Sequence, residues 1–368
     1  MSAIIDFFEN KQKLQVQSLA EALYLETYSV SNFKDYHTLL TGVKQKQQVI
    51  YLGELSEPVG QTRVISDCAM PTGLGTISNS EKIWTPIQWG EKRGFCADEW
   101  EPYISQYALK LGIDKFDMQD TEIMDVILDR IAKGLETAHW MKAWFGDLLA
   151  NVYSGSPAGE LVNVKYVPYF NSFDGFFKQM EDYVGVSAET AKQKVTIDGN
   201  ALGTFALQKA WGIADSTVWS GFNKAYDIAV ALDIDTPTHV RQGSGNTAYC
   251  TRLFFNALKM NFVGKGLESM FTNLQNGVTA LTVLGINFVP IDIWDTIIQT
   301  YLQNGTKYYD PYRVVLSPKD NLQYGTADDG ALSDVRTWFN NDENKTYMSL
   351  LERTDAKISM DNKFILAI

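Results

Sequence analysis

The sequence predicts an α+β fold, and three features of the chain carry this prediction. Apolar residues recur at steps of three and four from 120 to 150, which is typical of one long amphipathic helix. With a rise of about 1.5 Å per residue, this helix would be about 46 Å long. Segments of strand and helix character are mixed along the rest of the chain. The segment Lys357–Ala367, in which polar and apolar residues alternate, predicts a strand at the C-terminal end of the chain.

The composition is that of a globular protein. The chain has 368 residues, of which 45% are hydrophobic and 21% are charged, so it can bury a large core. Its 32 Lys and Arg residues against 44 Asp and Glu residues give a formal net charge of −12. A negative field repels phosphate, which argues against sequence-specific binding of DNA or RNA.

Targeting signals and disulfides are not expected. The first residues lack the basic and apolar regions of a signal peptide, and the apolar runs are shorter than the ~18 residues of a membrane span. Cys68, Cys96 and Cys250 are odd in number and far apart. That pattern favours free thiols in a reducing cytoplasm over a disulfide scaffold.

The first third of the chain predicts an arm followed by a long loop between two strands. Residues 2–28 have a helical pattern, whereas Lys44–Leu55 and Ile83–Trp89 have strand character. Pro86 cannot donate to a central ladder, so the second strand should lie at the edge of a sheet. The connection holds several Gly and Pro residues, and one of about 25 residues in a compact domain is usually functional or protruding.

The long helix has one continuous apolar stripe, and its charges complement the helix dipole. Acidic residues gather near its start, while Arg130, Lys133 and Lys142 come later. The stripe consists of Met124, Ile127, Leu128, Ile131, Leu135, Ala138, Met141, Phe145 and Leu148.

Further helices and strands are predicted after residue 154. A β-rich stretch is expected over 161–170. Helices are expected over 173–183, 204–211, 218–231 and 248–262. Strands are expected over 278–284, 287–290 and 312–316.

No motif predicts a cofactor site or a metal site. Gly243–Ala248 matches a relaxed dinucleotide-binding fingerprint, but a poor strand precedes it, so we interpret it as a loop in which Asn246 caps a helix. His37, His139 and His239 lie about a hundred residues apart without metal-ligand spacing, which favours packing or surface roles.

Catalytic residues are not expected either. The pairs Asp233 with Asp235 and Asp292 with Asp295 could in principle act as acid and base, but acids at such spacing are common. The aromatic residues could form a platform for a sugar or a nucleobase. Packing in the core and at subunit interfaces is the favoured use for Trp84, Trp89, Trp100, Trp140 and Trp144.

The order of these parts resembles the major capsid proteins of tailed bacteriophages, whose Hong Kong 97-type fold is shared with encapsulins and the herpesvirus shell floor. In that family an N-terminal arm precedes an extended β loop, a spine helix in a peripheral domain, an axial domain and a returning strand. The segment Val314–Gly325, followed by Asp328-Asp329-Gly330 and an apolar strand, resembles the end of such proteins. The resemblance implies an arm at 1–42, an extended β loop at 43–93, a peripheral domain at 94–154, an axial domain at 155–330 and a return at 331–368.

The resemblance also implies function and partners. It implies a structural, non-enzymatic subunit that assembles with itself into hexamers and pentamers of an icosahedral head around double-stranded DNA, and so resides in the virion after assembly in the host cytoplasm. It implies a portal, decoration proteins and a scaffold supplied by a separate protein or absent, with no cofactor and no membrane. We expect the loop to lie over an adjacent subunit, with contact candidates Ile65, Met70, Leu74, Ile77, Trp84 and Trp89.

Two alternatives stay open on the sequence. One is the shell of an encapsulin-like nanocompartment, which a cargo-loading peptide on a neighbouring gene would indicate. The other is an α+β enzyme or ligand-binding protein in which residues 55–82 form a lid. Convergent polar groups in a pocket, with perturbed titratable residues, would indicate that alternative.

Overall fold

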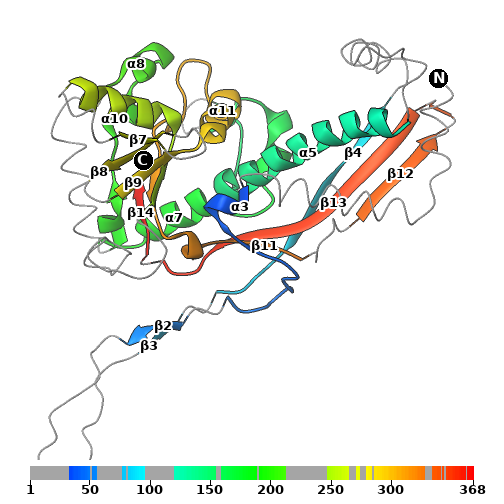
Figure 1. The fold of residues 1–368 in the computed structure, drawn as a ribbon, viewed down its shortest axis with the longest axis horizontal. Coiled ribbons are helices and arrows are strands. Elements are labelled where there is room, and N and C mark those ends of the chain that lie inside the picture. The colour runs from blue at the N-terminus through cyan, green and yellow to red at the C-terminus, as the bar shows by residue number, and fades with distance from the viewer. Residues whose placement is uncertain are drawn as a thin grey trace, which may run out of the picture.

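The fold consists of two mixed sheets, a long helix and a two-stranded ribbon, which confirms the predicted α+β class (Figure 1). The computed structural model describes residues 33–49, 52–55, 77–79, 82–95, 120–154, 159–188, 190–212, 247–264, 271–273, 279–283, 286–327, 334–340, 342–343, 345–361 and 363–368.

One sheet has five strands and is organised around β13 (Lys345–Ile358), a strand of 14 residues. Strand β4 (Ile87–Phe95) pairs with it along one side. The other side is occupied by β12 (Asp334–Asn340) and then by β11 (Leu322–Thr326), which also pairs in parallel with β1 (Thr38–Leu40). Among the described residues β4 is an edge strand, as the sequence predicted. The predicted bounds of 83–89 are wrong, because the strand begins only after Pro86.

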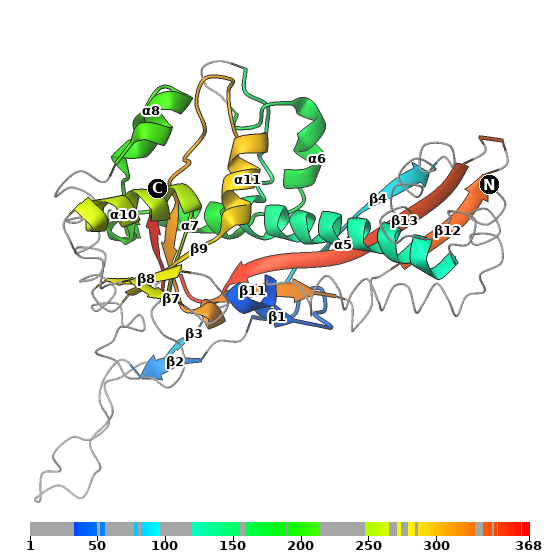
Figure 2. The same cartoon turned by 45° about the horizontal axis from the view of Figure 1, so that its top comes forward.

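The long helix α5 (Asp120–Phe145) has 26 residues and runs through Gly134 without a break. It extends beside β13 (Figure 2). The predicted end at 150 is wrong: Gly146 lies against the segment before α7, where a Cβ atom would come within 2.4 Å of the Phe173 carbonyl oxygen. The chain turns away at this contact, which leaves Leu148 and Leu149 54% and 76% exposed and outside the apolar stripe.

The second sheet has seven strands, and its side chains alternate between two core clusters. On β10 (Val314–Leu316), Val314 and Leu316 pack on one face with α10 (Arg252–Gly264), while Val315 packs on the other. That other face is covered by α7 (Phe176–Val184), α11 (Asp292–Tyr301) and the end of α5. Such alternation is the period of a strand buried on both faces. The remaining strands are β5 (Lys194–Val195), β14 (Ile365–Ala367), β6 (Thr247–Cys250), β9 (Ile286–Pro290), β8 (Thr279–Val283) and β7 (Phe271–Asn273).

Several predicted elements are confirmed. The helices over 173–183 and 204–211 correspond to α7 and to α8 (Phe205–Ala210), and the Thr204 side chain caps α8. The three strands between 278 and 316 correspond to β8, β9 and β10. The helix expected over 218–231 lies outside the described residues. The described residues also form short helical elements: α3 (Phe33–Tyr36), η2 (Val164–Tyr166), α6 (Val167–Phe170), η3 (Thr190–Gln193), η4 (Asp198–Ala201) and η6 (Lys319–Asn321).

Three further predictions about elements are wrong. The stretch 161–170 is helical rather than β-rich, because Asn163 caps η2 and a proline stands in the first turn of α6. Strand β6 occupies 247–250, so the helix expected from 248 begins only at Arg252. The terminal strand over 357–367 is in fact the end of β13 and the separate strand β14, which belong to different sheets.

Candidate functional site

The candidate functional site is the ribbon that projects from the body of the chain (Figures 1 and 2). Its strands β2 (Leu52–Leu55) and β3 (Ile77–Asn79) are antiparallel, with Leu52 opposite Asn79 and Leu55 opposite Ile77. A further bridge joins Gln48 to Ile83. The two halves of the predicted extended loop therefore pair with each other, and the residues that join β2 to β3 lie outside the described part.

Trp84 anchors the base of the ribbon on the five-stranded sheet. Its side chain is 2% exposed and forms a small core with Val43 and Val49. The indole lies so close to Gly325 of β11 that a Cβ atom there would be 2.7 Å from the ring. The Trp84 carbonyl accepts a hydrogen bond of 2.8 Å from Lys46, which joins the two sides of the base.

A buried carboxylate holds the next residue of the base. The Thr85 amide donates to Asp355 Oδ2 at 2.8 Å, and Asp355 is fully buried. Burial raises the pKa of Asp355, and the nearby Lys357 ammonium, 3.2 Å from Oδ2, counters that effect. The ribbon is thus tied to both β11 and β13.

The tryptophans proposed as intersubunit contacts pack within their own subunit. Trp84 is buried as described, and the Trp89 indole donates to Thr354 Oγ1 at 2.8 Å. Instead, Ile83 and Ile87, 46% and 39% exposed, present apolar surface at the base of the ribbon. The expected contact of the loop with an adjacent subunit stays a prediction. Ile65, Met70, Leu74 and the side chain of Ile77 lie outside the described part of the structure.

Gly325→Ala is expected to lower the free energy of unfolding by about 1–3 kcal/mol, because the new methyl group would overlap the Trp84 ring. Gly134→Ala is the matched control. No atom lies within 4 Å of a Cβ at that position, and alanine favours a helix interior, so it should raise stability by about 0.5–1 kcal/mol. Urea denaturation measures both. A neutral Gly325→Ala variant would contradict the anchoring role of Trp84.

The acid pair Asp292 and Asp295 is structural. Asp295 accepts hydrogen bonds from the amides of Arg252 and Leu253 at 2.5 and 3.0 Å and so caps α10 from a neighbouring helix. Asp292 forms a two-pronged ion pair with the Arg252 guanidinium at 2.5 and 2.8 Å. The helix that Asn246 was expected to cap begins only at Arg252, and Asn246 itself lies outside the described residues. Asp233 and Asp235 lie outside the described residues.

Asp295→Asn is expected to flatten the pH dependence of stability. Burial raises the pKa of Asp295 from 3.8 to about 6, so between these pH values the folded chain holds a proton that the unfolded chain releases. This contribution is present below pH 3.8 and is lost as the pH rises through about 6. Between pH 4 and pH 7, the free energy of unfolding of the variant should rise relative to that of the natural chain by up to about 3 kcal/mol. A pH-independent difference in urea titrations would contradict this.

Two histidines are buried and serve packing, as the sequence favoured. His37 Nε2 accepts a 2.6 Å hydrogen bond from the Trp144 indole, which leaves the proton on Nδ1 for the Phe33 carbonyl at 2.7 Å. Burial lowers the pKa of His37 to about 3. His139 Nδ1 is 2.9 Å from the Tyr324 hydroxyl, and its Nε2 is 3.2 Å from Glu352. His239 lies outside the described residues.

The described residues offer neither a cluster of metal ligands nor an accessible thiol. No group of three or more His, Cys, Asp or Glu residues there could hold a metal ion. Cys250 is fully buried, and burial raises the pKa of its thiol well above the ordinary value, which makes it a poor nucleophile. None of the described helices is long and apolar enough to cross a membrane. Gly243–Asn246, Cys68, Cys96 and Trp100 lie outside the described residues.

Comparisons with known proteins find structures but no sequence relatives. No protein-family model and no curated protein matches the chain. Among solved structures, the chain is similar to one in the procapsid of satellite phage P4, with 10% identity, coverage of 95% of this chain and 98% of that one, and a TM-score of 0.47.

Two further matches are capsid structures. The chain is similar to one in the capsid of an empty GTA particle, with 9% identity, 91% and 88% coverage and a TM-score of 0.48. It is also similar to one in the mature capsid of bacteriophage PhiM1, with 10% identity, 91% and 86% coverage and a TM-score of 0.44.

Proposed function

We propose that this chain is a structural subunit of the head of a tailed phage, with a Hong Kong 97-type fold, and that it assembles with itself into a closed shell. The ribbon is the observation that carries the proposal. Its base is anchored on the five-stranded sheet, while β2 and β3 pair with each other and project from the body (Figure 1). An isolated two-stranded hairpin is at best marginally stable in water, so such an element gains its packing from another molecule.

The rest of the architecture supports an extended subunit. Helix α5 and strand β13 are both unusually long, since mean helices and strands have about 11 and about 5 residues. Strand β13 is the central strand of the five-stranded sheet, which is separate from the seven-stranded sheet, and α5 extends beside it. In the proposed division, the peripheral domain comprises 94–154 and 331–368 and the axial domain 155–330. The last strand then departs from the family pattern, because β14 joins the seven-stranded sheet.

The proposed assembly contains hexamers and pentamers that enclose double-stranded DNA. Its partners are copies of the chain, a portal, and scaffolding and decoration proteins, and its place is the virion after assembly in the host cytoplasm. The net charge of −12 suits a wall that contains DNA without binding its sequence. Interfaces formed by projecting elements can adapt to the different curvatures around hexamers and pentamers.

Electron microscopy of the purified protein in negative stain tests the proposal. Rings or closed shells are expected once the protein is concentrated, with the same particles reappearing after dissociation and reassembly. Nucleic acid in particles from infected cells would separate a phage head from an encapsulin-like nanocompartment, which would hold a protein cargo instead. A protein that stays monomeric at every concentration and salt condition would contradict the proposal.

A subunit of this kind has no catalytic residues, and the candidate acids and thiol are expected to matter only for stability or assembly. Asp292→Ala removes an ion pair and Cys250→Ala leaves a small cavity, so both should lower the unfolding midpoint. Thermal unfolding and shell yield are the measurements. A turnover reaction abolished by either change in a folded protein would favour an enzyme with a lid.

A further inference from the structure

Two segments connect the same pair of sheets in opposite directions. Residues 317–321 lead from β10 of the seven-stranded sheet to β11 of the five-stranded sheet. Residues 359–364 lead back from β13 to β14. The two sheets share a core, to which Tyr324 and Ile358 contribute from one and Val315 and Leu366 from the other, and these two crossovers link the sheets beside it.

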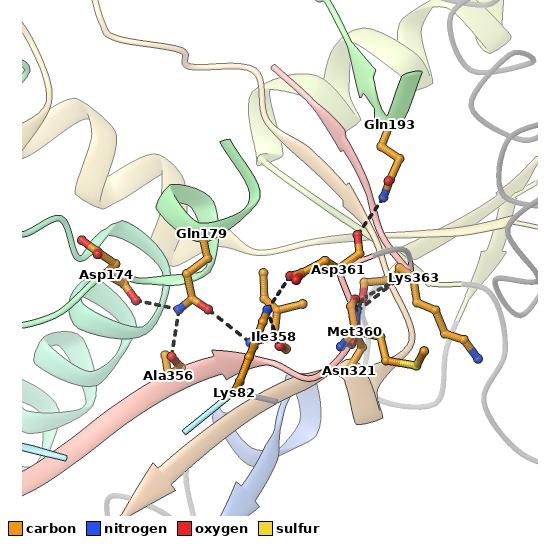
Figure 3. A network of polar contacts seen from close by, with 11 residues as sticks. Lys82, Asp174, Gln179, Gln193, Asn321, Ala356, Ile358, Met360, Asp361 and Lys363 are labelled. Carbon is orange, nitrogen blue, oxygen red and sulfur yellow. Dashed lines mark hydrogen bonds and ion pairs between the residues drawn. The ribbon is translucent and has the colours of Figure 1, made fainter. Parts of the chain in front are cut away.

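Asn321 binds the two crossovers together through its side-chain amide (Figure 3). Its Nδ2 donates to the carbonyls of Met360 and Lys363 at 3.0 and 3.1 Å, and its Oδ1 accepts from the Met360 amide at 2.7 Å. The Asn321 backbone carbonyl accepts from Ser359 at 3.0 Å. Between the sheets, neither crossover has the backbone hydrogen bonds of a strand ladder. The buried amide of Asn321 supplies hydrogen bonds in their place.

Two glutamines hold the ends of the second crossover, one from α7 and the other from the short helix η3. Gln179 of α7 donates to the Ala356 carbonyl at 2.8 Å, at the end of β13. Gln193, in the helix that leads into β5, donates to the carbonyls of Asp361 and Phe364 at 3.0 and 2.8 Å. Residue 361 is thus bonded to the element that leads into the seven-stranded sheet, whereas residue 358 is the last residue of β13 in the five-stranded sheet.

Lys82 spans these two points from the base of the ribbon. Its ammonium donates to the Ile358 carbonyl at 2.8 Å and forms an ion pair with the Asp361 carboxylate (Figure 3). Its backbone carbonyl accepts from Val49 at 2.7 Å, across the ribbon. Lys82 thus contacts the other side of the ribbon through its backbone, and the five-stranded sheet and the second crossover through its side chain.

We propose that Lys82 is a positioning residue that couples the direction of the ribbon to the relative orientation of the two sheets. If the sheets rotate about the crossovers, the Ile358 carbonyl and the Asp361 carboxylate move relative to each other. The ammonium can then satisfy both only if the base of the ribbon moves as well. The use of this coupling in shell assembly rests on the proposed function, whereas the coupling itself belongs to the single subunit.

Hydrogen exchange of the full-length, unassembled subunit tests the coupling. Lys82→Met keeps the length of the side chain and removes its charge and donors. It is expected to speed amide exchange about 3- to 10-fold at 359–364 and at 43–49, with the rest of the chain unchanged. Asp361→Asn, a change in the crossover, should speed exchange at 43–49 as well, and the double variant should add little to the larger single effect.

Lys82→Arg should retain slow exchange, and Lys44→Met, an exposed lysine at the same base, should change nothing. The proposal is overturned if Asp361→Asn affects 359–364 alone, because the ribbon would then be independent of the crossover. A uniform rise along the whole chain in Lys82→Met overturns it too, since that indicates only a lower global stability. The measurement needs no shell, so a chain that fails to assemble leaves this test intact.

Discussion

Replacing residues 56–76 by a two-residue Asn-Gly turn is expected to give a folded subunit that no longer forms closed shells. Leu55 and Ile77 are opposite each other, which is the spacing that a tight hairpin turn joins, so β2, β3 and the anchored base are kept. The replaced segment holds Ile65, Met70 and Leu74, whose burial against a neighbour would offset the cost of ordering the ribbon. Circular dichroism and electron microscopy measure the two properties separately.

The control is a Gly-Ser segment of the same length as 56–76, which keeps the reach of the ribbon and removes its apolar side chains. If side-chain contacts drive assembly, this variant should also yield subunits without shells. Normal shells from the shortened ribbon would show that it is not an assembly element. Loss of the folded state would show that the segment belongs to the subunit's own core.

Trp144→Ala is expected to lower the free energy of unfolding by about 3–5 kcal/mol, the largest stability effect of any substitution proposed here. The indole is fully buried, its ring centre lies 4.5 and 5.2 Å from those of Trp294 and Phe177, and its N–H is the partner of His37 Nε2. Alanine leaves a cavity where α5, α7 and α11 meet, and it leaves His37 without that partner.

Urea denaturation followed by circular dichroism measures the loss. Trp144→Phe should recover most of the packing but not the hydrogen bond, and so fall between the natural chain and the alanine variant. Leu149→Ala, at a side chain that is 76% exposed, is the surface control and should stay within about 0.5 kcal/mol. A loss below 1 kcal/mol for Trp144→Ala would mean that the core can close around the cavity.

Local pattern was enough to predict the parts of the fold that local chemistry governs. The apolar steps of α5 placed a helix that runs through Gly134, and Pro86 indicated that the strand at this point of the chain lies at a sheet edge. The Gly and Pro residues between the two strands of the extended loop predicted its long connection. None of these conclusions requires a distant contact, because helix periodicity and the missing proline donor act within a few residues.

Contacts between distant residues decided the rest. The long strand β13 escaped prediction because polar side chains such as Glu352, Thr354 and Asp355 are buried in it, and the sequence cannot show which partners will satisfy them. In the same way, Ile83 and Trp84 point to opposite faces of the segment, but the sequence does not show which face is buried. The Trp84 face is buried because its ring packs against Gly325, which lies 241 positions further along the chain.

The sequence by itself determined the class of the fold, the long helix, the edge strand and the long connection that follows residue 55. Only the tertiary structure decided that α5 ends where Gly146 meets the backbone near Phe173, and that Asp295 caps a helix instead of serving as a catalytic acid. It also decided that the last strand leaves β13 for the other sheet. Each of these outcomes depends on which distant groups come into contact, and backbone propensity carries no information about that.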